Sequence, residues 1–572
     1  VFWLFGLTHG WWRYVSIPDV IDLVKANVIA SLLLVAWVLF VGPKGVPRSV
    51  LLLDGFFCFL FSGGVRVVTR AYRENYLPHS FGPKPDGNRR TLVFGAGQGG
   101  QLIVREIRQN PSLGVELVGF ADDDPGKRGQ RFQGLPVLGT SSQLAALCEE
   151  YRIEEIIIAI PSARGAQLRT LVERCRGTGV RFKTLPGVSD LIDGRVTVQQ
   201  IRPIDLEDLL GREPVHLDRA GIRAYLQGKR VLVTGAAGSI GSELCRQVAN
   251  FAPGQLILFD NAESPLFHLE RELAETHPEL PRVAVIGDVR DQARVDGVFE
   301  RLQPQVVFHA AAYKHVPMME LNPAEAVINN VHGTRIVADA AVKAGVAHMV
   351  MVSTDKAVNP TNVMGASKRA AELYVQGLAA ASHTHFVTVR FGNVLGSAGS
   401  VIPIFREQIL KGGPVTVTHP EVTRYFMTIP EAAQLVLQAG SMGQGGEIFL
   451  LDMGEPVKIA DLAYELIRLS GHEPGKEIEI VFTGLRPGEK LYEELLIAGE
   501  GVVPTSHEKI RVARAVPVDM ASITRQCEAL YESARAIDIP RVLAQLRTLV
   551  PEYNPADNGN SLAHLDKTAK ER

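Results

Sequence analysis

Apolar and polar residues alternate along most of the chain in blocks that predict short buried strands separated by helices. Strands that alternate with helices in this way are typical of a doubly wound parallel β-sheet. The clearest apolar runs lie at 231–234, 256–260, 282–289, 306–311, 348–354 and 386–394. Weaker runs of the same kind predict an earlier sheet at 91–94, 117–121, 153–162 and 180–187. The pattern therefore predicts an α/β protein with two tandem Rossmann-type sheets.

The first 75 residues differ, because two long apolar runs lie there. Residues 28–41 (VIASLLLVAWVLFV) and 49–65 (SVLLLDGFFCFLFSGGV) flank the segment GPKGVPR. Each run is shorter than the ~20 residues that span a bilayer, although residues 21–26 extend the first. We predict N-terminal transmembrane helices here, with a buried hairpin or a signal peptide as alternatives. Arginines after the second run favour a cytoplasmic C-terminal part, and they are Arg66, Arg70, Arg73, Arg89 and Arg90.

Composition excludes several classes of protein. The chain has 572 residues, of which 46% are hydrophobic and 21% are charged, which fits several globular domains. A net charge of −2 gives no sign of a nucleic-acid partner. The five cysteines form no CxxC pair and no metal-ligand spacing, so we expect reduced thiols and no zinc site. Because Val1 opens another apolar stretch, we expect the N-terminus to be incomplete.

Two glycine-rich turns follow predicted strands. Residues 91–100 (TLVFGAGQGG) have GxGxxG spacing, and residues 231–241 (VLVTGAAGSIG) have GxxGxxG spacing. Glycines let the backbone turn tightly and approach a pyrophosphate, which then lies on the amide groups at a helix start. The second turn contains Gly235, Gly238 and Gly241. The predicted strands that follow it support its assignment as a nucleotide-binding turn.

Acidic residues end the strands after the second turn. Asp260 ends the next strand, where a carboxylate accepts hydrogen bonds from an adenosine ribose and repels a 2′-phosphate. We therefore predict NAD in preference to NADP. Asp288 ends the third strand, where an adenine contact is expected. In the earlier predicted sheet, which has its glycine-rich turn at 91–100, Asp122 to Asp124 follow the second strand. This pattern fits either a nucleotide site or a vestigial or regulatory domain.

The segment 353–368 (STDKAVNPTNVMGASK) carries the candidate chemistry. The predicted strand ends at Thr354 and delivers Asp355 and Lys356 to the carboxyl edge of the sheet, where ligands bind in such folds. Met364 and Lys368 lie one helical turn apart. The segment looks like the active-site segment of a dehydrogenase-type enzyme, in which a tyrosine usually stands four residues before the lysine. Here Met364 takes that position, and methionine cannot accept a proton.

Several motifs together resemble the membrane-bound nucleotide-sugar 4,6-dehydratases of bacterial polysaccharide biosynthesis. These enzymes are extended short-chain dehydrogenase/reductases that act on UDP-N-acetylglucosamine. The motifs are TGAAGSIGSEL, FDNAESPLF, HAAAYKHVPMME, NNVHGT, STDKAVNPTNVMGASKR, RFGNVLGSAGSVIPIF and LRPGEKLYEELL. The resemblance implies an NAD-dependent lyase with a UDP-sugar substrate, anchored as a multi-pass protein in the inner membrane. Membrane lipid and further copies of the chain are its expected partners.

The resemblance also implies a reaction in which a hydride leaves sugar C4, water is lost across C5 and C6, and the hydride returns to C6. Following the family, Lys356 is the base at C5 and Asp355 the acid at O6. Desolvation and a nearby positive charge are expected to lower the pKa of Lys356. Thr354 is the nearest hydroxyl to stand in for the tyrosine, and we expect it to relay the O4 proton through water to Lys368. Met364 is expected either to be a core-facing helix residue or to touch the cofactor or sugar passively.

The resemblance also implies cofactor-binding and substrate-binding roles for other residues in these motifs. Predicted cofactor contacts are Gly235, Gly238, Ser239, Ile240, Gly241, Asp260, Asp288, Val289, Ala310, Ala311, Tyr313 and Lys368. Predicted substrate contacts are Lys314, His315, Asn393, Ser397, Ser400, Arg424, Arg486 and Glu489. Arginines suit a diphosphate because they bind it with two parallel hydrogen bonds.

The predicted domain order is transmembrane helices at 1–75, a first Rossmann-like domain at 88–205, a connector at 206–228, the catalytic domain at 229–515, and C-terminal helices with a polar tail at 516–572. A nucleotide-sugar epimerase is the alternative enzyme, because the same hydride chemistry serves epimerisation. A membrane-tethered NAD-sensing scaffold without activity is the alternative from another class.

Overall fold

The structure is a computed structural model. It describes residues 17–42, 47, 49–50, 53–61, 64, 88–160, 162–163, 165–185, 208, 212, 215–494, 501–513 and 518–555. The start of the predicted connector and the polar tail from residue 556 lie largely or wholly outside these residues, as does part of the second apolar run.

The N-terminal apolar segment forms helix α1 (Ile17–Phe40). Within the described parts of the chain, no helix is both long and apolar enough to cross a bilayer. The uninterrupted apolar run in α1, residues 28–40, rises only about 20 Å, against ~30 Å of hydrocarbon in a membrane. The predictions of transmembrane helices and of a multi-pass membrane location are therefore wrong, while the predicted lipid partner stays a prediction.

The first Rossmann-type sheet is confirmed. Its strand order is β3-β4-β2-β1-β5-β6, and the short edge strand β3 is antiparallel to its neighbour β4. The strands are β1 (Arg89–Phe94), β2 (Val115–Ala121), β3 (Arg131–Phe132), β4 (Leu135–Gly139), β5 (Glu155–Ile158) and β6 (Arg181–Thr184). The helices are α3 (Gln98–Gln109), α4 (Leu144–Glu150) and α5 (Gly165–Arg176).

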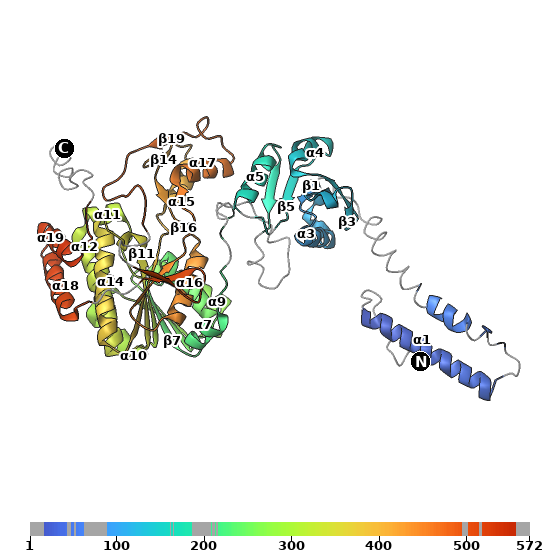
Figure 1. The fold of residues 1–572 in the computed structure, drawn as a ribbon, viewed down its shortest axis with the longest axis horizontal. Coiled ribbons are helices and arrows are strands. Elements are labelled where there is room, and N and C mark those ends of the chain that lie inside the picture. Colours follow the sequence, from blue (N-terminus) through green and yellow to red (C-terminus); the bar gives the residue numbers. More distant parts are fainter. Residues whose placement is uncertain are drawn as a thin grey trace. The chain divides into compact units, whose positions relative to one another are not determined.

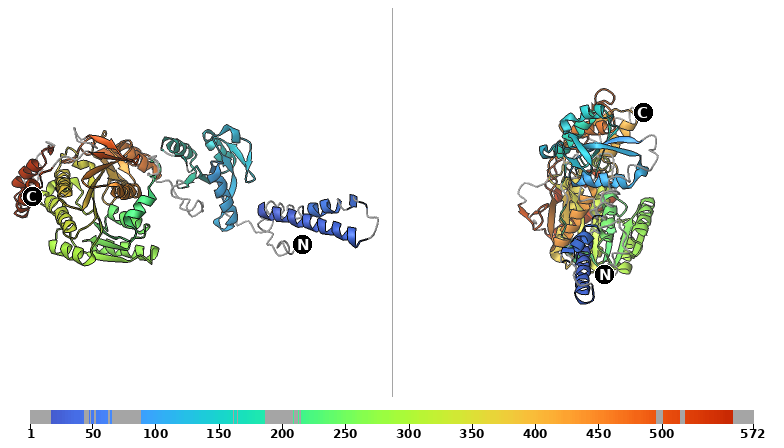
Figure 2. Two further views of the ribbon diagram at one scale, coloured as in Figure 1. Left: turned by 60° about the horizontal axis from the view of Figure 1, so that its bottom comes forward. Right: turned by 90° about the vertical axis from the view of Figure 1, so that its right-hand side faces the viewer.

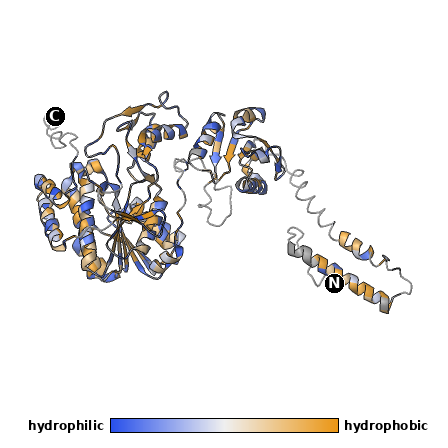
Figure 3. Ribbon diagram, in the orientation of Figure 1, coloured by the Kyte–Doolittle hydropathy of each residue, from blue (hydrophilic) through white to orange (hydrophobic). Residues whose placement is uncertain are grey.

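The second sheet has nine strands in the order β20-β21-β17-β12-β11-β10-β7-β8-β9. All neighbours pair in parallel except β21, which is antiparallel to both strands beside it. Figure 1 shows this sheet in the larger body, and Figure 3 shows that its central strands are apolar. The strands are β7 (Arg230–Thr234), β8 (Gln255–Asp260), β9 (Arg282–Ile286), β10 (Val306–His309), β11 (His348–Thr354), β12 (His385–Phe391), β17 (Glu447–Leu451), β20 (Val502–Pro504) and β21 (Ile510–Ala513).

Helices cover both faces of this sheet, so its strands are buried on two sides (Figures 1 and 2). One face packs against α10 (Gln292–Leu302), α13 (Thr334–Lys343) and α14 (Val363–Ala381). The other face packs against α7 (Arg219–Leu226), α8 (Ser239–Ala249), α9 (Glu263–Thr276) and α16 (Ile429–Met442). The strand order reverses between β7 and β10, which is where ligands bind in open parallel sheets.

Smaller elements stand at the carboxyl edge of the large sheet and beside it. The predicted C-terminal helical stretch forms two helices, α18 (Met520–Arg535) and α19 (Ile539–Leu549), and both pack against α14. Short helices α11 (Val316–Leu321) and α12 (Pro323–Ala326) lead into a π-helical turn, η7 (Val327–Gly333). A second group comprises β13 (Asn393–Val394), α15 (Val401–Leu410), β14 (Val415–Val417), β15 (Thr423–Arg424), β16 (Phe426–Met427), β18 (Val457–Lys458), α17 (Ile459–Leu469) and β19 (Ile480–Phe482).

Candidate active site

The turn after β7 forms a cradle that only glycine fits. Gly235 has φ of +67°, and a Cβ there would lie 2.6 Å from the backbone nitrogen of Ala311. A Cβ on Gly241 would lie 1.9 Å from the carbonyl oxygen of Gly235. Gly238 is the N-cap of α8, so the amide groups of the helix start face the turn. This geometry fits a dinucleotide whose pyrophosphate lies at the start of α8.

Asp260 is fixed at the end of β8 beside this turn. Its Oδ2 accepts a hydrogen bond from the backbone N–H of Ala237 at 2.8 Å, and its Oδ1 accepts one from Ala262 at 2.9 Å. The residue is 8% exposed. Each carboxylate oxygen keeps a further lone pair, so the group can still accept hydrogen bonds from a ribose diol. The arrangement fits the predicted role of Asp260.

The first sheet has the same arrangement of a glycine-rich turn and an aspartate at the end of the next strand. Gly95 has φ of +104°, and a Cβ on Gly100 would again lie 1.9 Å from a carbonyl oxygen, that of Gly95. Asp122 at the end of β2 accepts a hydrogen bond from the backbone N–H of Ala96 at 2.7 Å. Unlike Asp260, it also binds a cation, Lys127, at 3.0 Å. Whether this turn holds a nucleotide stays a prediction.

Asp288 and Val289 are less available than predicted. Both oxygens of Asp288 accept hydrogen bonds from the guanidinium of Arg290, the closest at 2.7 Å, and this holds the pKa of Asp288 below its usual range. Val289 is 5% exposed and belongs to the hydrophobic core. Arg290, which the sequence patterns did not single out, therefore occupies the carboxylate of Asp288, and the adenine contact at this position stays a prediction.

The remaining predicted cofactor contacts lie where the order of strands reverses. Ala310 and Ala311 follow β10, and the backbone N–H of Ala310 donates to the carbonyl of Thr234 on β7 at 3.0 Å. Asn330 holds the next residues in place, because its side chain bonds both the N–H and the carbonyl of Tyr313. Ser239 begins α8 and Ile240 packs beside the core. His309 is buried between two threonine hydroxyls, and burial lowers its pKa to about 3, so it is neutral and structural.

Thr354, Asp355 and Lys356 form one hydrogen-bonded group at the end of β11. Thr354 Oγ1 donates to Asp355 Oδ1 at 2.8 Å. Lys356 Nζ donates to the same oxygen at 2.9 Å and to Asn393 Oδ1 at 3.1 Å. Thr354 also caps the short turn η8 (Asp355–Ala357), since its side chain accepts a hydrogen bond from the backbone N–H of Lys356. The strand end thus places a hydroxyl, a carboxylate and an amine within contact of each other.

The charge around Lys356 differs from the sequence prediction. Glu493 Oε1 lies 3.6 Å from Lys356 Nζ, and its side chain is only 4% exposed. Burial lowers the pKa of Lys356, but the charges of Asp355 and Glu493 raise it by more. The predicted lowering of this pKa is therefore wrong, and the resting amine is protonated. Glu493 comes from a segment far away in sequence, which is why the prediction did not include it.

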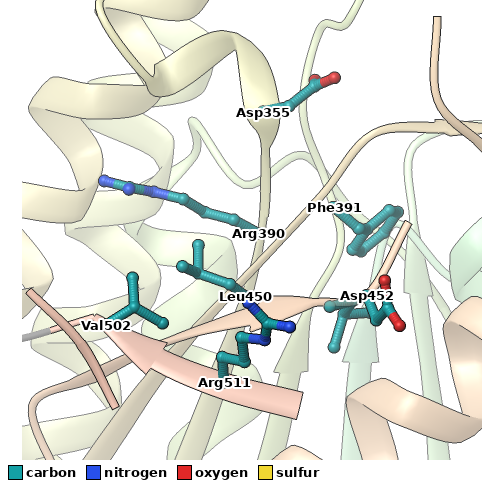
Figure 4. A pocket seen from close by; sticks show the side chains of 8 residues that line it. Asp355, Arg390, Phe391, Leu450, Asp452, Val502 and Arg511 are labelled. Atoms are coloured by element: carbon teal, nitrogen blue, oxygen red, sulfur yellow. The ribbon is translucent and has the colours of Figure 1, made fainter. Parts of the chain in front are cut away.

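Asp355 is also one of the residues that line a small cavity. Its Oδ2 is buried and has no hydrogen-bond partner among the residues that the structure describes, and its side chain is 0% exposed. It lines a cavity of about 120 Å³ below the strand ends, shown in Figure 4. That volume holds a few water molecules but is too small for a nucleotide sugar. The other lining residues are Arg390, Phe391, Leu450, Leu451, Asp452, Val502 and Arg511.

Met364 and Lys368 lie on α14, as the sequence predicted. Met364 is 2% exposed and packs in the hydrophobic core. Lys368 Nζ donates to the carbonyl of Val352 at 2.8 Å, and burial lowers its pKa to about 8. No hydrogen bond between Thr354 and Lys368 is found among the described side chains. The Thr354 hydroxyl instead donates to Asp355 Oδ1.

A buried ion network supports α14 beneath this group. Glu372 accepts two hydrogen bonds from Arg390, at 2.9 and 2.7 Å, one from Arg369 at 3.1 Å, and one from Ser353 at 2.6 Å. Burial raises the pKa of Glu372, but the charges and hydrogen bonds of Arg390 and Arg369 lower it by more, so that the pKa is about 2. Because Ser353 precedes Thr354 on β11, the network fixes the strand that carries the hydrogen-bonded group of Thr354, Asp355 and Lys356. Sequence patterns did not reveal it.

The predicted substrate residues form two groups. In the first, Glu489 binds Arg424 at 3.2 Å and Arg486 at 3.3 Å, and Arg424 also lies 3.5 Å from Glu493. Arg486 is exposed, whereas Arg424 is 8% exposed. Glu489 thus holds two arginines in place, and its predicted contact with the substrate stays a prediction.

The second group lies near the cofactor turn. The backbone N–H of Ala398 donates to Ser239 Oγ at 3.2 Å, which brings the loop 394–400 to the start of α8. A Cβ on Gly399 would lie 2.7 Å from the ring of His315, the N-cap of α11. Burial and the charges of Lys314 and Arg486 lower the pKa of His315. Ser397 donates to Val394, while the buried hydroxyl of Ser400 has no partner among the described atoms.

Comparisons with known proteins place the chain in a family. A family model described as polysaccharide biosynthesis protein matches residues 231–515, and one described as CoA-binding domain matches residues 9–186. The capsular polysaccharide biosynthesis protein CapD of Staphylococcus aureus is 45% identical over 514 residues, covering 89% of this chain and 84% of that protein.

Two shorter relatives match about half of the chain. The inverting UDP-N-acetylglucosamine 4,6-dehydratase of Campylobacter jejuni (serotype O:2) is 35% identical, covering 47% of this chain and 77% of that protein. The UDP-glucose 4-epimerase of Rickettsia canadensis is 38% identical, with the same coverage of each chain. With the cradle after β7 and the group at the end of β11, these matches show that the chain belongs to the polysaccharide biosynthesis protein family.

Proposed function

We propose that the protein is an NAD-dependent 4,6-dehydratase that converts UDP-N-acetylglucosamine to a UDP-4-keto-6-deoxy sugar for bacterial polysaccharide biosynthesis. The observation that carries the proposal is the hydrogen-bonded pair of Asp355 and Lys356, at 2.9 Å, on the strand end beside the dinucleotide cradle. Dehydration across C5 and C6 needs an acid and a base next to each other. A 4,6-dehydratase of UDP-N-acetylglucosamine among the relatives supports the same choice.

The cofactor is NAD. Gly235 and Gly241 leave room for its pyrophosphate, and Asp260 stands where a carboxylate favours a ribose diol over a 2′-phosphate. When bound, it supplies the hydride acceptor for C4 and the hydride donor for C6. Lys368, with a pKa lowered to about 8, is the residue proposed to hold the nicotinamide ribose.

The hydroxyl of Thr354 replaces the missing tyrosine. The proton of the sugar O4 passes to Thr354 Oγ1 as the Thr354 proton passes to Asp355 Oδ1 across 2.8 Å. The acceptor is therefore Asp355, in place of the relay to Lys368 that the sequence suggested. This transfer leaves Asp355 protonated, which is the form that an acid at O6 requires.

Elimination then uses both members of the pair. Lys356, once neutral, removes the proton from C5, and Asp355 gives its proton to O6, so that the C6–O6 bond breaks and water leaves. The new double bond is reduced at C6, and Lys356 returns a proton to C5. Asn393 holds the amine toward this position, since its Oδ1 accepts a hydrogen bond from Lys356 at 3.1 Å.

Positive charge at the edge of the site suits the substrate diphosphate. Arg424, Arg486, Lys314 and His315 are the groups proposed to bind it, with Ser397 and Ser400 on the loop beside them. Partial burial lowers the pKa of Lys314, which indicates that an anion there would stabilise its charged form. Glu489 orients the two arginines through contacts of 3.2 and 3.3 Å.

An epimerase is the second candidate, because a UDP-glucose 4-epimerase is 38% identical over 277 residues. An epimerase needs no acid beside C6, so the Asp355–Lys356 pair favours dehydration. The mass of the product separates the two reactions. Incubation of the purified chain with NAD and UDP-N-acetylglucosamine should give a product lighter by one water, whereas an unchanged mass would identify an epimerase.

A further inference from the structure

A third carboxylate stands beside the proposed base. Glu493 Oε1 lies 3.6 Å from Lys356 Nζ and 3.5 Å from Arg424 Nε. The side chains of Glu493 and Arg424 are 4% and 9% exposed. Solvent therefore screens this cluster poorly, and the charge of Glu493 acts strongly on Lys356.

The proposed reaction leaves one proton without a destination. Lys356 begins as an ammonium, because Asp355 and Glu493 together raise its pKa. The O4 proton then occupies Asp355, so Asp355 cannot also take a proton from Lys356. Yet Lys356 must lose a proton before it can accept the one on C5. Among the described residues, Glu493 is the other carboxylate paired with Lys356 within 4 Å.

We propose that Glu493 takes the proton of Lys356 before elimination and returns it at the end of the cycle. The inference rests on the proposed function. The protons then balance: Asp355 gains one from O4 and gives it to O6, Lys356 gains one from C5 and returns one to C5, and Glu493 gains one from Lys356 and gives it back. No other acid or base is needed. Glu493 acts through Lys356 and does not touch the sugar.

The placement of the segment that carries Glu493 fits this role, because it sets the carboxylate beside Lys356. The charged and polar groups that face Lys356 are Asp355, Asn393, Glu493 and, through Glu493, Arg424. Glu493 lies in a segment that is attached to the active-site loop. In this segment, Gly488 O accepts from Asn362 Nδ2 at 3.1 Å, and Lys490 Nζ donates to Val358 O at 3.2 Å. The segment therefore holds the carboxylate beside the amine.

The test compares Glu493→Gln with a matched control, Glu494→Gln. Glu494 is the next residue, and its side chain is 49% exposed, lies 3.7 Å from Lys490 Nζ and accepts a hydrogen bond from Asn359 Nδ2. Glu493→Gln should still oxidise C4, because Thr354 and Asp355 are intact. It should then stall, so that reduced nicotinamide accumulates on the enzyme while water loss and deuterium exchange at C5 fall about 10²-fold. Glu494→Gln should behave as the wild type.

Two further readouts separate proton transfer from a structural effect. In Glu493→Gln the rate of C5 exchange should rise about tenfold per pH unit, because Lys356 must then lose its proton to solvent, whereas wild type should change little over the same interval. Glu493→Asp should restore part of the exchange, since it keeps a carboxylate. A parallel loss of C4 oxidation and C5 exchange that higher pH does not relieve would overturn the inference. Wild-type protein without water loss would instead overturn the proposed function.

Discussion

Thr354→Val tests the proton path that replaces the tyrosine. Valine has nearly the shape of threonine, so the change removes the hydroxyl without opening a cavity. It deletes the 2.8 Å hydrogen bond to Asp355 and the one accepted from the backbone N–H of Lys356. A hydrogen bond to a charged group contributes about 1.5–3 kcal/mol, so we expect a fall of about 2 kcal/mol in the free energy of unfolding.

The catalytic effect should be larger than the loss of stability implies. Without Thr354 Oγ1 the O4 proton has no described group to pass through to Asp355. Loss of a general acid–base step costs at least about 10²-fold in rate, or about 2.7 kcal/mol in the activation barrier. The assay is the single-turnover reduction of bound nicotinamide by UDP-N-acetylglucosamine, at a temperature where the variant is folded.

Thr354→Ser is the matched control, because it keeps the hydroxyl. It should retain most of the rate of C4 oxidation, while Thr354→Val loses it. Near-normal turnover in folded Thr354→Val would refute the relay. Equal and severe loss in both variants would show that the methyl group of Thr354 matters and the hydroxyl does not.

Two other predictions concern the scaffold. Gly241→Ala should abolish NAD binding in a direct titration, because its Cβ would lie 1.9 Å from the carbonyl oxygen of Gly235; wild-type affinity would contradict the cradle. Glu372→Gln should lower the free energy of unfolding at neutral pH by about 3 kcal/mol. The folded-state pKa of Glu372 is about 2, below its ordinary 4.5, so its contribution is complete above pH 4.5 and is lost as pH falls toward 2. Denaturation at several pH values should show the two proteins converging below pH 4.5, and a constant difference would contradict this.

Local patterns in the sequence predicted much of the fold. The apolar run before Gly235 and the spacing of the glycines predicted a strand, a turn and a helix, and the structure has β7 and α8 there. The run 348–354 matches β11 at both ends. The run 282–289 is cut short as β9 at Ile286, because Gly287 to Val289 form the turn after the strand.

Predictions that depended on residues distant in sequence were weaker. The sign of the pKa shift of Lys356 was wrong because Glu493, 137 positions later, brings a second negative charge beside it. Asp288 looked free in the sequence, but Arg290 turns back onto it. The buried ion pair of Glu372 and Arg390 was not predicted, because the sequence around a charged residue does not show which distant residue pairs with it. The membrane prediction rested on apolar runs alone, and the described helices do not support it.

The central claim is that Lys356 and Asp355 remove water from the hexose across C5 and C6. The most direct test follows the reaction of the purified chain with NAD and UDP-N-acetylglucosamine in deuterated water by NMR. We predict a 4-keto-6-deoxy sugar with deuterium at C5, and no such incorporation with Lys356→Ala. A sugar that keeps its oxygen at C6, or undiminished deuterium at C5 with Lys356→Ala, would contradict the claim.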